Sequence, residues 1–387
     1  MYDCVIVGAG FCGAVIARKI AEELDKNVLV IERRNHIAGN AYDELNDIGI
    51  LVQKYGPHIF HTDSEEVYNF ILKYSKWNDY KLKCEVVMDG KNTPSPFNFD
   101  TIEMFFDEDE AKLIKENIKL EYPDKNKATI VEMLESNNYV VRNYAEFLFK
   151  KDYSLYTSKQ WGILPKDIDI NVLKRVPVRF DYVDMYFDNK YECLPKDGYT
   201  VFFDNLLNHK NIELVKGVNA LEHISINNNR LLINGIDSLI PVVFTGAIDE
   251  LLEYKYGKLP YRSLYFKYEI KEVDSFQNAP VVAYPQVKDY TRITEYTKLP
   301  YQDAKGKTTI AYEFPIQFDN EKNGIEPYYP IINDENQEKY NKYLEHVKKI
   351  ENLFLCGRLA DYKYYNMDNA IERAFYVYSE LKRYMLK

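Results

Sequence analysis

The sequence predicts an α/β fold that combines a Rossmann-like nucleotide-binding domain with a helical insertion and an antiparallel β-sheet domain. A buried strand, a glycine-rich turn and a helix open the chain. Residues 100–160 show the apolar spacing of helices, whereas residues 261–330 consist mostly of short Tyr-rich strands. A strand and a helix close the chain, so we expect the nucleotide-binding domain to use both ends of the sequence.

The first fifty residues contain the complete pattern of a dinucleotide-binding unit. Residues 2–7 predict a buried strand, GAGFCG follows, and residues 27–32 predict a second strand after an amphipathic helix. Gly8 would make the tight turn, and Gly10 would let the backbone approach a pyrophosphate. Gly13 would permit close packing of helix and strand. The helix N-terminus would offer N–H groups and partial positive charge to the phosphates.

The residues after the second strand favour FAD over NAD. Glu32 ends this strand, where its carboxylate can accept hydrogen bonds from the adenosine ribose. Arg33 follows at once, and Gly39 and Asn40 form a small polar loop of the kind that flavoproteins place against the cofactor. NADP is the competing interpretation, because an arginine here can meet a 2′-phosphate, but Glu32 would repel that phosphate.

Composition places the chain among ordinary globular proteins. Its 387 residues predict two or three domains, and 46% of them are hydrophobic. A formal charge of −10 without a basic run argues against nonspecific nucleic-acid binding. The 35 Tyr residues suit polar clefts as well as cores, because a phenol packs its ring and bonds through its hydroxyl. Coding bias is the alternative explanation of this count.

Cysteine usage and hydropathy bear on the compartment. Five scattered cysteines without a CxxC pair argue against a disulfide framework or a zinc site and fit a reducing cytoplasm. The apolar N-terminus lacks a basic leader and a cleavage pattern, and no apolar run reaches the roughly 18 residues of a membrane span. His58 and His61 lie three residues apart without further candidate ligands nearby, so we expect no metal site.

Two regions in the middle of the chain need an interpretation. Lys174, Arg175 and Arg179 lie on a stretch interrupted by a proline. They fit either a solvated charged face or a loop that brings an arginine to an anionic ligand. Residues 212–246 predict a small β meander within the nucleotide-binding domain.

Taken together, these segments resemble the bacterial type of the UDP-galactopyranose mutase family. The matching segments occur in the family's order and span nearly the whole chain. They are GAGFCG, ERRNHIAGNAYD, YGPHIFHTD, YTSKQWG, LKRVPVRF, YRSLYFK, YTRITE, EPYYPI and GRLADYKYYNMD. The resemblance implies a discontinuous FAD-binding domain (1–75, 195–250 and 340–387). It also implies a helical domain with the start of a mobile loop (76–165), and a substrate domain of loop and antiparallel sheet (166–194 and 251–339).

The resemblance also implies an activity. Family members interconvert the six- and five-membered ring forms of UDP-galactose for cell-surface polysaccharide precursors, without net redox change. In this scheme N5 of the reduced flavin attacks the anomeric carbon, UDP leaves, and the ring opens and recloses on the flavin adduct. The protein binds a UDP-sugar, and a homodimer is expected by the same resemblance.

Roles for individual residues follow from the matched motif positions. Arg175 on the mobile loop, Arg292 and His61 are the expected catalytic residues. The two arginines would bind the diphosphate and stabilise the negative charge of the leaving group, because guanidinium matches phosphate oxygens bidentately. His61 matches a histidine beside the flavin. The expected substrate-binding residues are Tyr156, Thr157, Trp161, Tyr186, Tyr329, Tyr364 and Asn366. The expected cofactor-binding residues are Gly8, Gly10, Phe11, Gly13, Glu32, Arg33, Gly39, Asn40, His58, Arg358 and Met367.

Several positions depart from the family pattern. Ala283 stands where many members have Asn near the sugar, Tyr296 stands where His is common, and Asn366 replaces an Asp. We expect these positions to face the sugar, while the diphosphate-binding residues match the family. A lost polar contact weakens discrimination for one sugar substituent. UDP-N-acetylgalactosamine and dTDP-fucose are therefore alternative substrates. An FAD-dependent amine oxidase or desaturase, and a non-enzymatic nucleotide-sugar-binding protein, are the competing functions.

Overall fold

A five-stranded parallel sheet forms the nucleotide-binding part of the protein, as the opening motif predicts. The structure is a computed structural model that describes residues 1–162, 173–174, 176–319 and 325–387. The strand order is β12-β2-β1-β16-β22, so the first strand lies at the centre of the sheet. The strands are β1 (Cys4–Val7), β2 (Val28–Glu32), β12 (Ile212–Lys216), β16 (Val242–Phe244) and β22 (Leu353–Leu355). Burial on both faces explains their short apolar sequences.

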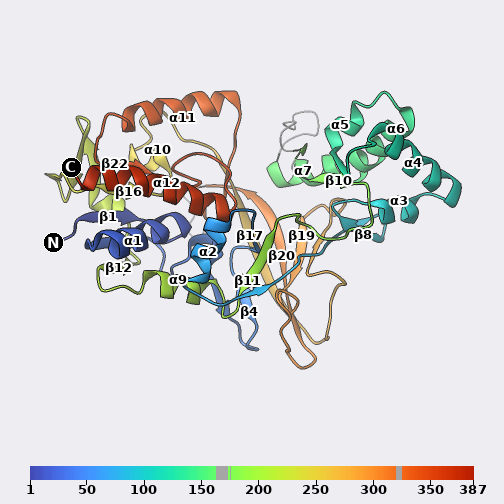
Figure 1. Ribbon diagram of the computed structural model, residues 1–387, viewed down its shortest axis with the longest axis horizontal. Coiled ribbons are helices and arrows are strands. Elements are labelled where there is room, and N and C mark those ends of the chain that lie inside the picture. Colours follow the sequence, from blue (N-terminus) through green and yellow to red (C-terminus); the bar gives the residue numbers. More distant parts are fainter. Residues whose placement is uncertain (163–172, 175, 320–324) are drawn as a thin grey trace.

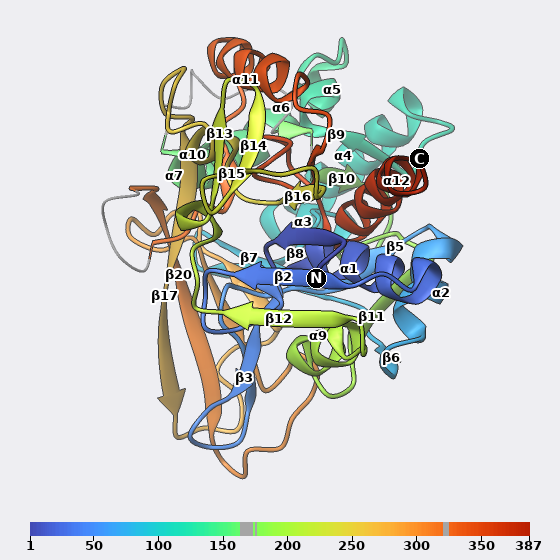
Figure 2. The same ribbon diagram turned by 90° about the vertical axis from the view of Figure 1, so that its left-hand side faces the viewer.

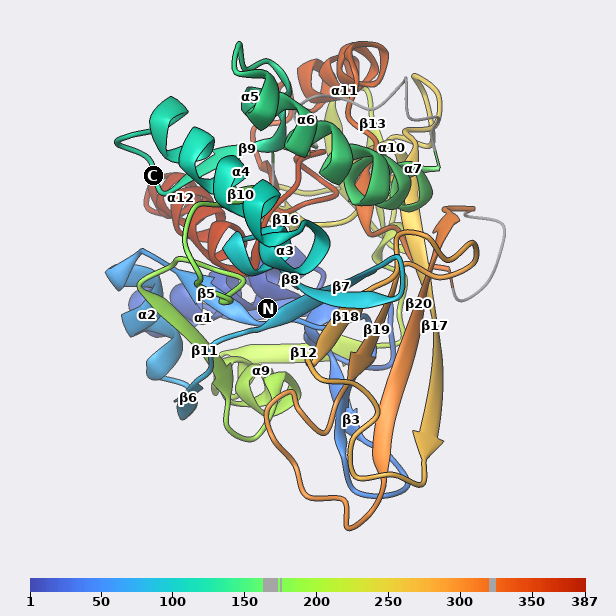
Figure 3. The same ribbon diagram turned by 90° about the vertical axis from the view of Figure 1, so that its right-hand side faces the viewer.

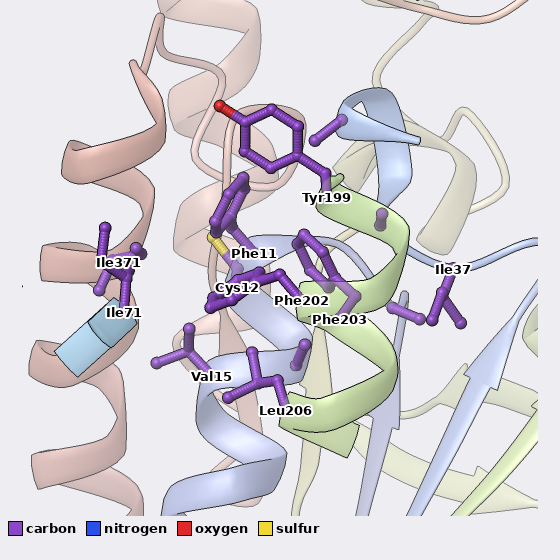
Figure 4. Close-up of a cluster of buried hydrophobic side chains, with 14 of the residues drawn as sticks. Phe11, Cys12, Val15, Ile37, Ile71, Tyr199, Phe202, Phe203, Leu206 and Ile371 are labelled. Atoms are coloured by element: carbon purple, nitrogen blue, oxygen red, sulfur yellow. The ribbon is translucent and has the colours of Figure 1, made fainter. Parts of the chain in front are cut away.

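Helices and hairpins cover the two faces of this sheet (Figures 1 and 2). One face packs against helices from both ends of the chain, and Figure 4 shows Phe11, Phe203 and Ile371 converging in that core. These helices are α1 (Phe11–Leu24), α2 (Glu65–Leu72), α9 (Tyr199–Leu207) and α12 (Met367–Met385). The second face carries α10 (Ile248–Leu251), α11 (Asp334–Val347), η4 (Ala220–Glu222) and the strands β13 (Ile224–Asn227), β14 (Arg230–Ile233) and β15 (Ile236–Asp237).

The meander expected at residues 212–246 is wrong at both of its ends. The first strand, β12, pairs in parallel with β2, and the last strand, β16, pairs in parallel with β1. Only the middle strands form antiparallel hairpins. Short apolar runs do not distinguish a hairpin strand from a buried parallel strand, because both lack a long polar alternation.

A seven-stranded, mostly antiparallel sheet stands beside the nucleotide-binding part. Its order is β21-β17-β20-β19-β18-β7-β8, and Figure 3 shows the long strands β17 and β20 along its edge. Its members are β7 (Cys84–Met88), β8 (Lys91–Ser95), β17 (Tyr261–Lys271), β18 (Val281–Ala283), β19 (Arg292–Glu295), β20 (Thr308–Gln317) and β21 (Tyr329–Pro330). Arg292 on β19 faces Ala283 on one side and Glu313 on the other in the strand register.

A helical unit with its own core lies at the far end of this sheet (Figures 1 and 3). It contains α3 (Phe99–Phe105), α4 (Glu108–Glu121), α5 (Ile130–Leu134), α6 (Tyr139–Leu148), the π-helical turn η2 (Phe149–Tyr153) and α7 (Ser154–Trp161). The strands β9 (Lys127–Thr129) and β10 (Pro177–Arg179) pair within it. Helix α7 also contacts β20, which joins the unit to the sheet.

Short strands connect the three parts. They are β3 (Asp43–Leu45), β4 (Leu51–Gln53), β5 (Phe60–Thr62), β6 (Trp77–Asp79) and β11 (Tyr191–Pro195), with η1 (Gly39–Ala41) before them. Residues 84–95 depart from the expected division, because β7 pairs with β18 and β8 pairs with β7, so both strands belong to the seven-stranded sheet. We propose the same three domains with this hairpin moved to the sheet. Among the described residues, none of the helices has the length and apolar character that a membrane crossing requires.

Candidate active site

A groove at the carboxyl ends of the parallel strands is formed by backbone from both halves of the chain. It holds about 1250 Å³, counting space open to solvent. Ten of the eleven expected cofactor-binding residues line it: Gly8, Gly10, Phe11, Glu32, Arg33, Gly39, Asn40, His58, Arg358 and Met367. Asn366, expected with the substrate, also lines this groove. The position fits the general rule that open α/β sheets bind ligands beyond the carboxyl ends of their strands.

The glycines determine the shape of this groove. Gly8 has a φ of +103°, a conformation that favours glycine. A Cβ at Gly39 would lie 3.2 Å from the Cα of Gly10, so two backbone segments meet at the groove wall. Gly13 is not part of the lining. A Cβ there would lie 1.9 Å from the carbonyl oxygen of Gly8, which identifies its task as helix–strand packing.

The chemistry of the groove fits a dinucleotide. No side chain caps the start of α1 at Gly10, so the first N–H groups of the helix are available to a phosphate. The Glu32 carboxylate accepts backbone hydrogen bonds from Ala9 (2.8 Å) and Arg34 (2.9 Å), which fixes its position. Its oxygens retain lone pairs for ribose hydroxyls. Arg33 is held by Glu326, at 2.7 Å.

The two histidines of the GPHIFHT segment lie in different surroundings. His58 lines the groove, and its Nδ1 lies 2.8 Å from the carbonyl oxygen of Gly56. Because a carbonyl only accepts, Nδ1 carries the proton and Nε2 is the acceptor. Burial, helped by Arg358 and Arg292, lowers the pKa of His58 to about 4. His61 instead stacks on Phe187, with ring centroids 3.9 Å apart, outside the groove lining.

A cluster of side chains around Arg292 adjoins the groove. The Nε of Arg292 donates to Glu313 at 2.7 Å, and this carboxylate holds the pKa of Arg292 well above its usual value. Tyr156 of α7 lies within electrostatic range of Arg292, Glu313, Tyr186 and Tyr329. Helix α7, strands β19, β20 and β21 and the segment around Tyr186 thus meet here. The Arg292 cluster is the set formed by Tyr156, Tyr186, Arg292, Glu313, Tyr329, Arg358 and Tyr364.

Arg358 belongs to both the groove and the Arg292 cluster. Its guanidinium lies 5.3 Å from the ring centre of Tyr329 and 5.1 Å from that of Tyr364. These two rings are stacked, with centroids 5.8 Å apart. Trp161, at the end of α7, lies 6.3 Å from Tyr329 by the same measure. The two sites are therefore contiguous.

The remaining expected residues are placed as follows. Thr157 is buried on α7, one residue after Tyr156. Tyr186 packs edge-on against Phe187, with centroids 4.9 Å apart. Arg175, expected as the second diphosphate arginine, lies outside the described residues. Among the described residues, no group of three or more potential metal ligands occurs.

Known proteins match this arrangement over nearly the full chain. The family model for UDP-galactopyranose mutase matches residues 151–364, and a model for NAD(P)-binding Rossmann-like domains matches residues 6–74. The dTDP-fucopyranose mutase of Escherichia coli is 37% identical over 380 residues, which cover 97% of either chain. The chain belongs to the UDP-galactopyranose mutase family.

Two further family members agree with this assignment. The UDP-galactopyranose mutase of Mycoplasma pneumoniae is 34% identical, over 96% of this chain and 94% of its own. The crystal structure of a reduced UDP-galactopyranose mutase has the same fold, with a TM-score of 0.75 at 16% identity, covering 99% of this chain and 94% of that one. The α/β fold with a Rossmann-like domain is thereby confirmed, and so is the family resemblance.

Two of the positions that depart from the family pattern lie in contrasting places. Ala283 is the register partner of Arg292, so its methyl group lies beside that side chain on one face of the sheet. Tyr296 is fully buried, and its hydroxyl donates to the carbonyl oxygen of Gln53 at 2.7 Å. The expectation that Tyr296 faces the sugar is therefore wrong: an aromatic ring of this size fills the core behind the site.

Sequence reasoning assigned no role to Arg262, which stands in the YRSLYFK motif. Its side chain is 8% exposed, and its Nε donates to the carbonyl oxygen of Gln160 at 3.0 Å. Within the described part of the chain, no carboxylate pairs with it, and burial lowers its pKa. It is the register partner of Tyr329, so a further buried cation adjoins the Arg292 cluster. Alternation along β17 could have indicated that this arginine lies on an inner face.

Proposed function

We propose that this protein is a flavin-dependent mutase that interconverts the pyranose and furanose forms of a nucleotide sugar. The observation that supports it most is the contiguity of two sites. A dinucleotide groove and a cluster of arginine and tyrosine side chains share Arg358. A substrate diphosphate held in the cluster would therefore place its sugar beside a cofactor in the groove.

FAD is the proposed cofactor, and the groove residues described above would hold it. When bound in its reduced state, the flavin would supply the nucleophilic N5 atom for the anomeric carbon of the sugar. The glycines bring the backbone to the pyrophosphate, and Glu32 orients the ribose. His58 offers an unprotonated Nε2 at neutral pH, which suits it to accept a hydrogen bond from the cofactor or the sugar.

The Arg292 cluster would bind the diphosphate and stabilise the leaving nucleotide. Glu313 keeps Arg292 charged and engages only its Nε, so among the described residues the two terminal nitrogens of Arg292 remain for phosphate oxygens. Burial raises the pKa of Tyr156 and of Tyr329. Both phenols therefore keep their protons at neutral pH and donate hydrogen bonds to an anion. Arg175 is proposed as the second arginine of this site.

UDP-galactopyranose is the first candidate substrate, because the matching family model and the Mycoplasma relative carry that name. dTDP-fucopyranose is the second, favoured by the relative from Escherichia coli. The placement of Ala283 beside Arg292 supports this second candidate, because a methyl group there offers no hydrogen bond to a sugar hydroxyl and suits a 6-deoxy sugar.

Turnover by the dithionite-reduced holoprotein tests the proposal. UDP-galactopyranose, UDP-N-acetylgalactosamine and dTDP-fucopyranose would be supplied separately, with both ring forms resolved by HPLC. We expect a furanose product from at least one of them, and the highest kcat/KM identifies the sugar. Substrate-dependent oxygen consumption by the oxidised protein, without any furanose product, would instead indicate an amine oxidase-like enzyme.

A further inference from the structure

Lys159 has an unusual set of partners for a lysine on a helix. From α7 its ammonium group reaches four carbonyl oxygens of one short loop, those of Tyr284, Pro285, Val287 and Tyr290. The donor–acceptor distances lie between 2.5 and 3.4 Å. The loop, residues 284–290, connects β18 to β19.

Four carbonyl dipoles that converge on one point repel one another unless a cation lies between them. An ammonium group with three protons provides that cation and forms charge-assisted hydrogen bonds. Burial lowers the pKa of Lys159 to about 8, while the carboxylates of Asp152 and Asp289 act in the opposite direction. Lys159 is therefore mostly protonated at neutral pH, and the conformation of the loop depends on it.

This contact lies between the elements that carry Tyr156 and Arg292, two members of the Arg292 cluster. Tyr156 lies three residues before Lys159 and so on the same side of α7. Arg292 lies two residues after Tyr290, at the start of β19. The loop begins directly after Ala283. A shift of the loop relative to α7 would therefore change the distance between the phenol and the guanidinium.

We propose that Lys159 is a positioning residue, whose ammonium group fixes loop 284–290 against α7 and so sets the spacing of Tyr156 and Arg292 for the substrate diphosphate. The proposal rests on the proposed diphosphate-binding function of the cluster. Lys159 acts through the loop and is not itself assigned a contact with the substrate. Its effect should fall on binding, because the spacing matters equally before and during the reaction.

Steady-state kinetics of Lys159→Met in the reduced holoenzyme test this. We expect KM for the nucleotide sugar to rise by roughly tenfold or more, with kcat within about threefold of wild type and flavin content unchanged. Lys125→Met is the matched control. Lys125 lies in the same helical unit and forms an exposed pair with Glu132 at 2.8 Å, without a contact to loop 284–290. A merely structural lysine would lower the melting temperature and the active fraction without changing KM.

Chemical rescue provides a second, independent measurement. In Lys159→Ala the side chain is replaced by a hole that ends at four carbonyl oxygens, so propylammonium should restore a low KM, whereas an equal concentration of propanol should not. Should both neutral variants fail to fold, Lys159→Arg decides. Its planar fork keeps the charge but does not fit four converging carbonyls, so we expect a folded protein with a raised KM.

The proposal is overturned if folded Lys159→Met keeps a wild-type KM, if propylammonium has no effect, or if Lys159→Arg binds substrate normally. Failure of the proposed function looks different. In that case the wild-type holoenzyme produces no second ring form from any of the nucleotide sugars, before any variant is compared.

Discussion

The dinucleotide groove and the Arg292 cluster are built in opposite ways. The groove is made largely of backbone, and much of it comes from the first forty residues, where Gly8, Gly10 and Glu32 lie close together in sequence. The cluster is made of side chains from separate elements, and Tyr156, Arg292 and Tyr329 are more than a hundred residues apart at the extremes. Much of the first site is therefore specified by one local motif, whereas the second forms only when the helical unit, the seven-stranded sheet and the segment around Tyr364 come together.

The largest expected effect comes from closing the groove. In Gly10→Val, the new side chain would enter the space next to Gly39, whose Cα would lie 3.7 Å from the added Cβ. We expect a folded protein without flavin, and therefore without mutase activity. Absorbance near 450 nm measures the flavin, and circular dichroism checks the fold. Full flavin occupancy in Gly10→Val would show that the cofactor does not bind in this groove.

The cluster is broken by Arg292→Ala, which should leave the groove intact. We expect kcat/KM to fall by about 10² to 10³ because a charged partner of the diphosphate is lost, while the flavin content stays normal. Arg230→Ala is the control, because Arg230 forms an exposed pair with Asp237 on a surface hairpin. Similar rates for Arg292→Ala and wild type would remove Arg292 from the diphosphate role.

A smaller effect is expected when only the hydroxyl of Tyr329 is removed and its ring is kept. Tyr329→Phe keeps the stacking on Tyr364 and removes one hydrogen-bond donor, so we expect KM to rise by roughly fivefold to tenfold. Tyr301→Phe, at a side chain that is 82% exposed, should leave KM unchanged. If the two variants behave alike, packing and not hydrogen bonding explains Tyr329.

The last prediction concerns stability and not turnover: it is the pH dependence of unfolding that His58 contributes. Its pKa of about 4 in the folded protein lies below the usual 6.5, so the unfolded chain binds more protons between these values. The free energy of unfolding therefore falls as pH drops from about 6.5 towards 4, by at most about 3 kcal/mol from this group. Urea unfolding of the flavin-free protein at several pH values measures it. His58→Gln should flatten this part of the profile. A difference in free energy of unfolding between wild type and His58→Gln that stays the same at every pH would contradict the assignment.

The sequence predicts the groove better than the Arg292 cluster, for the same reason that distinguishes how the two sites are built. The strand–GxGxxG–helix–strand–Glu32 pattern predicted the groove from residues alone, because each part acts through local backbone geometry. The sequence places the strands at 84–95 in the helical domain, because nothing within them shows that β7 pairs with β18, nearly two hundred residues away. Likewise, only the family resemblance pointed to Tyr156 and Tyr329, and Lys159 gained a role only from the carbonyl oxygens that the fold gathers around it.

The most direct test of the account is turnover approached from both ring forms in both redox states. With the flavin reduced, we predict that pyranose and furanose forms of the preferred nucleotide sugar reach the same final ratio, without net consumption of reductant. The oxidised protein should leave both forms unchanged. Equal activity in the two redox states, or none in the reduced state with flavin and nucleotide sugar both bound, would contradict the claim that the groove and the Arg292 cluster form one mutase site.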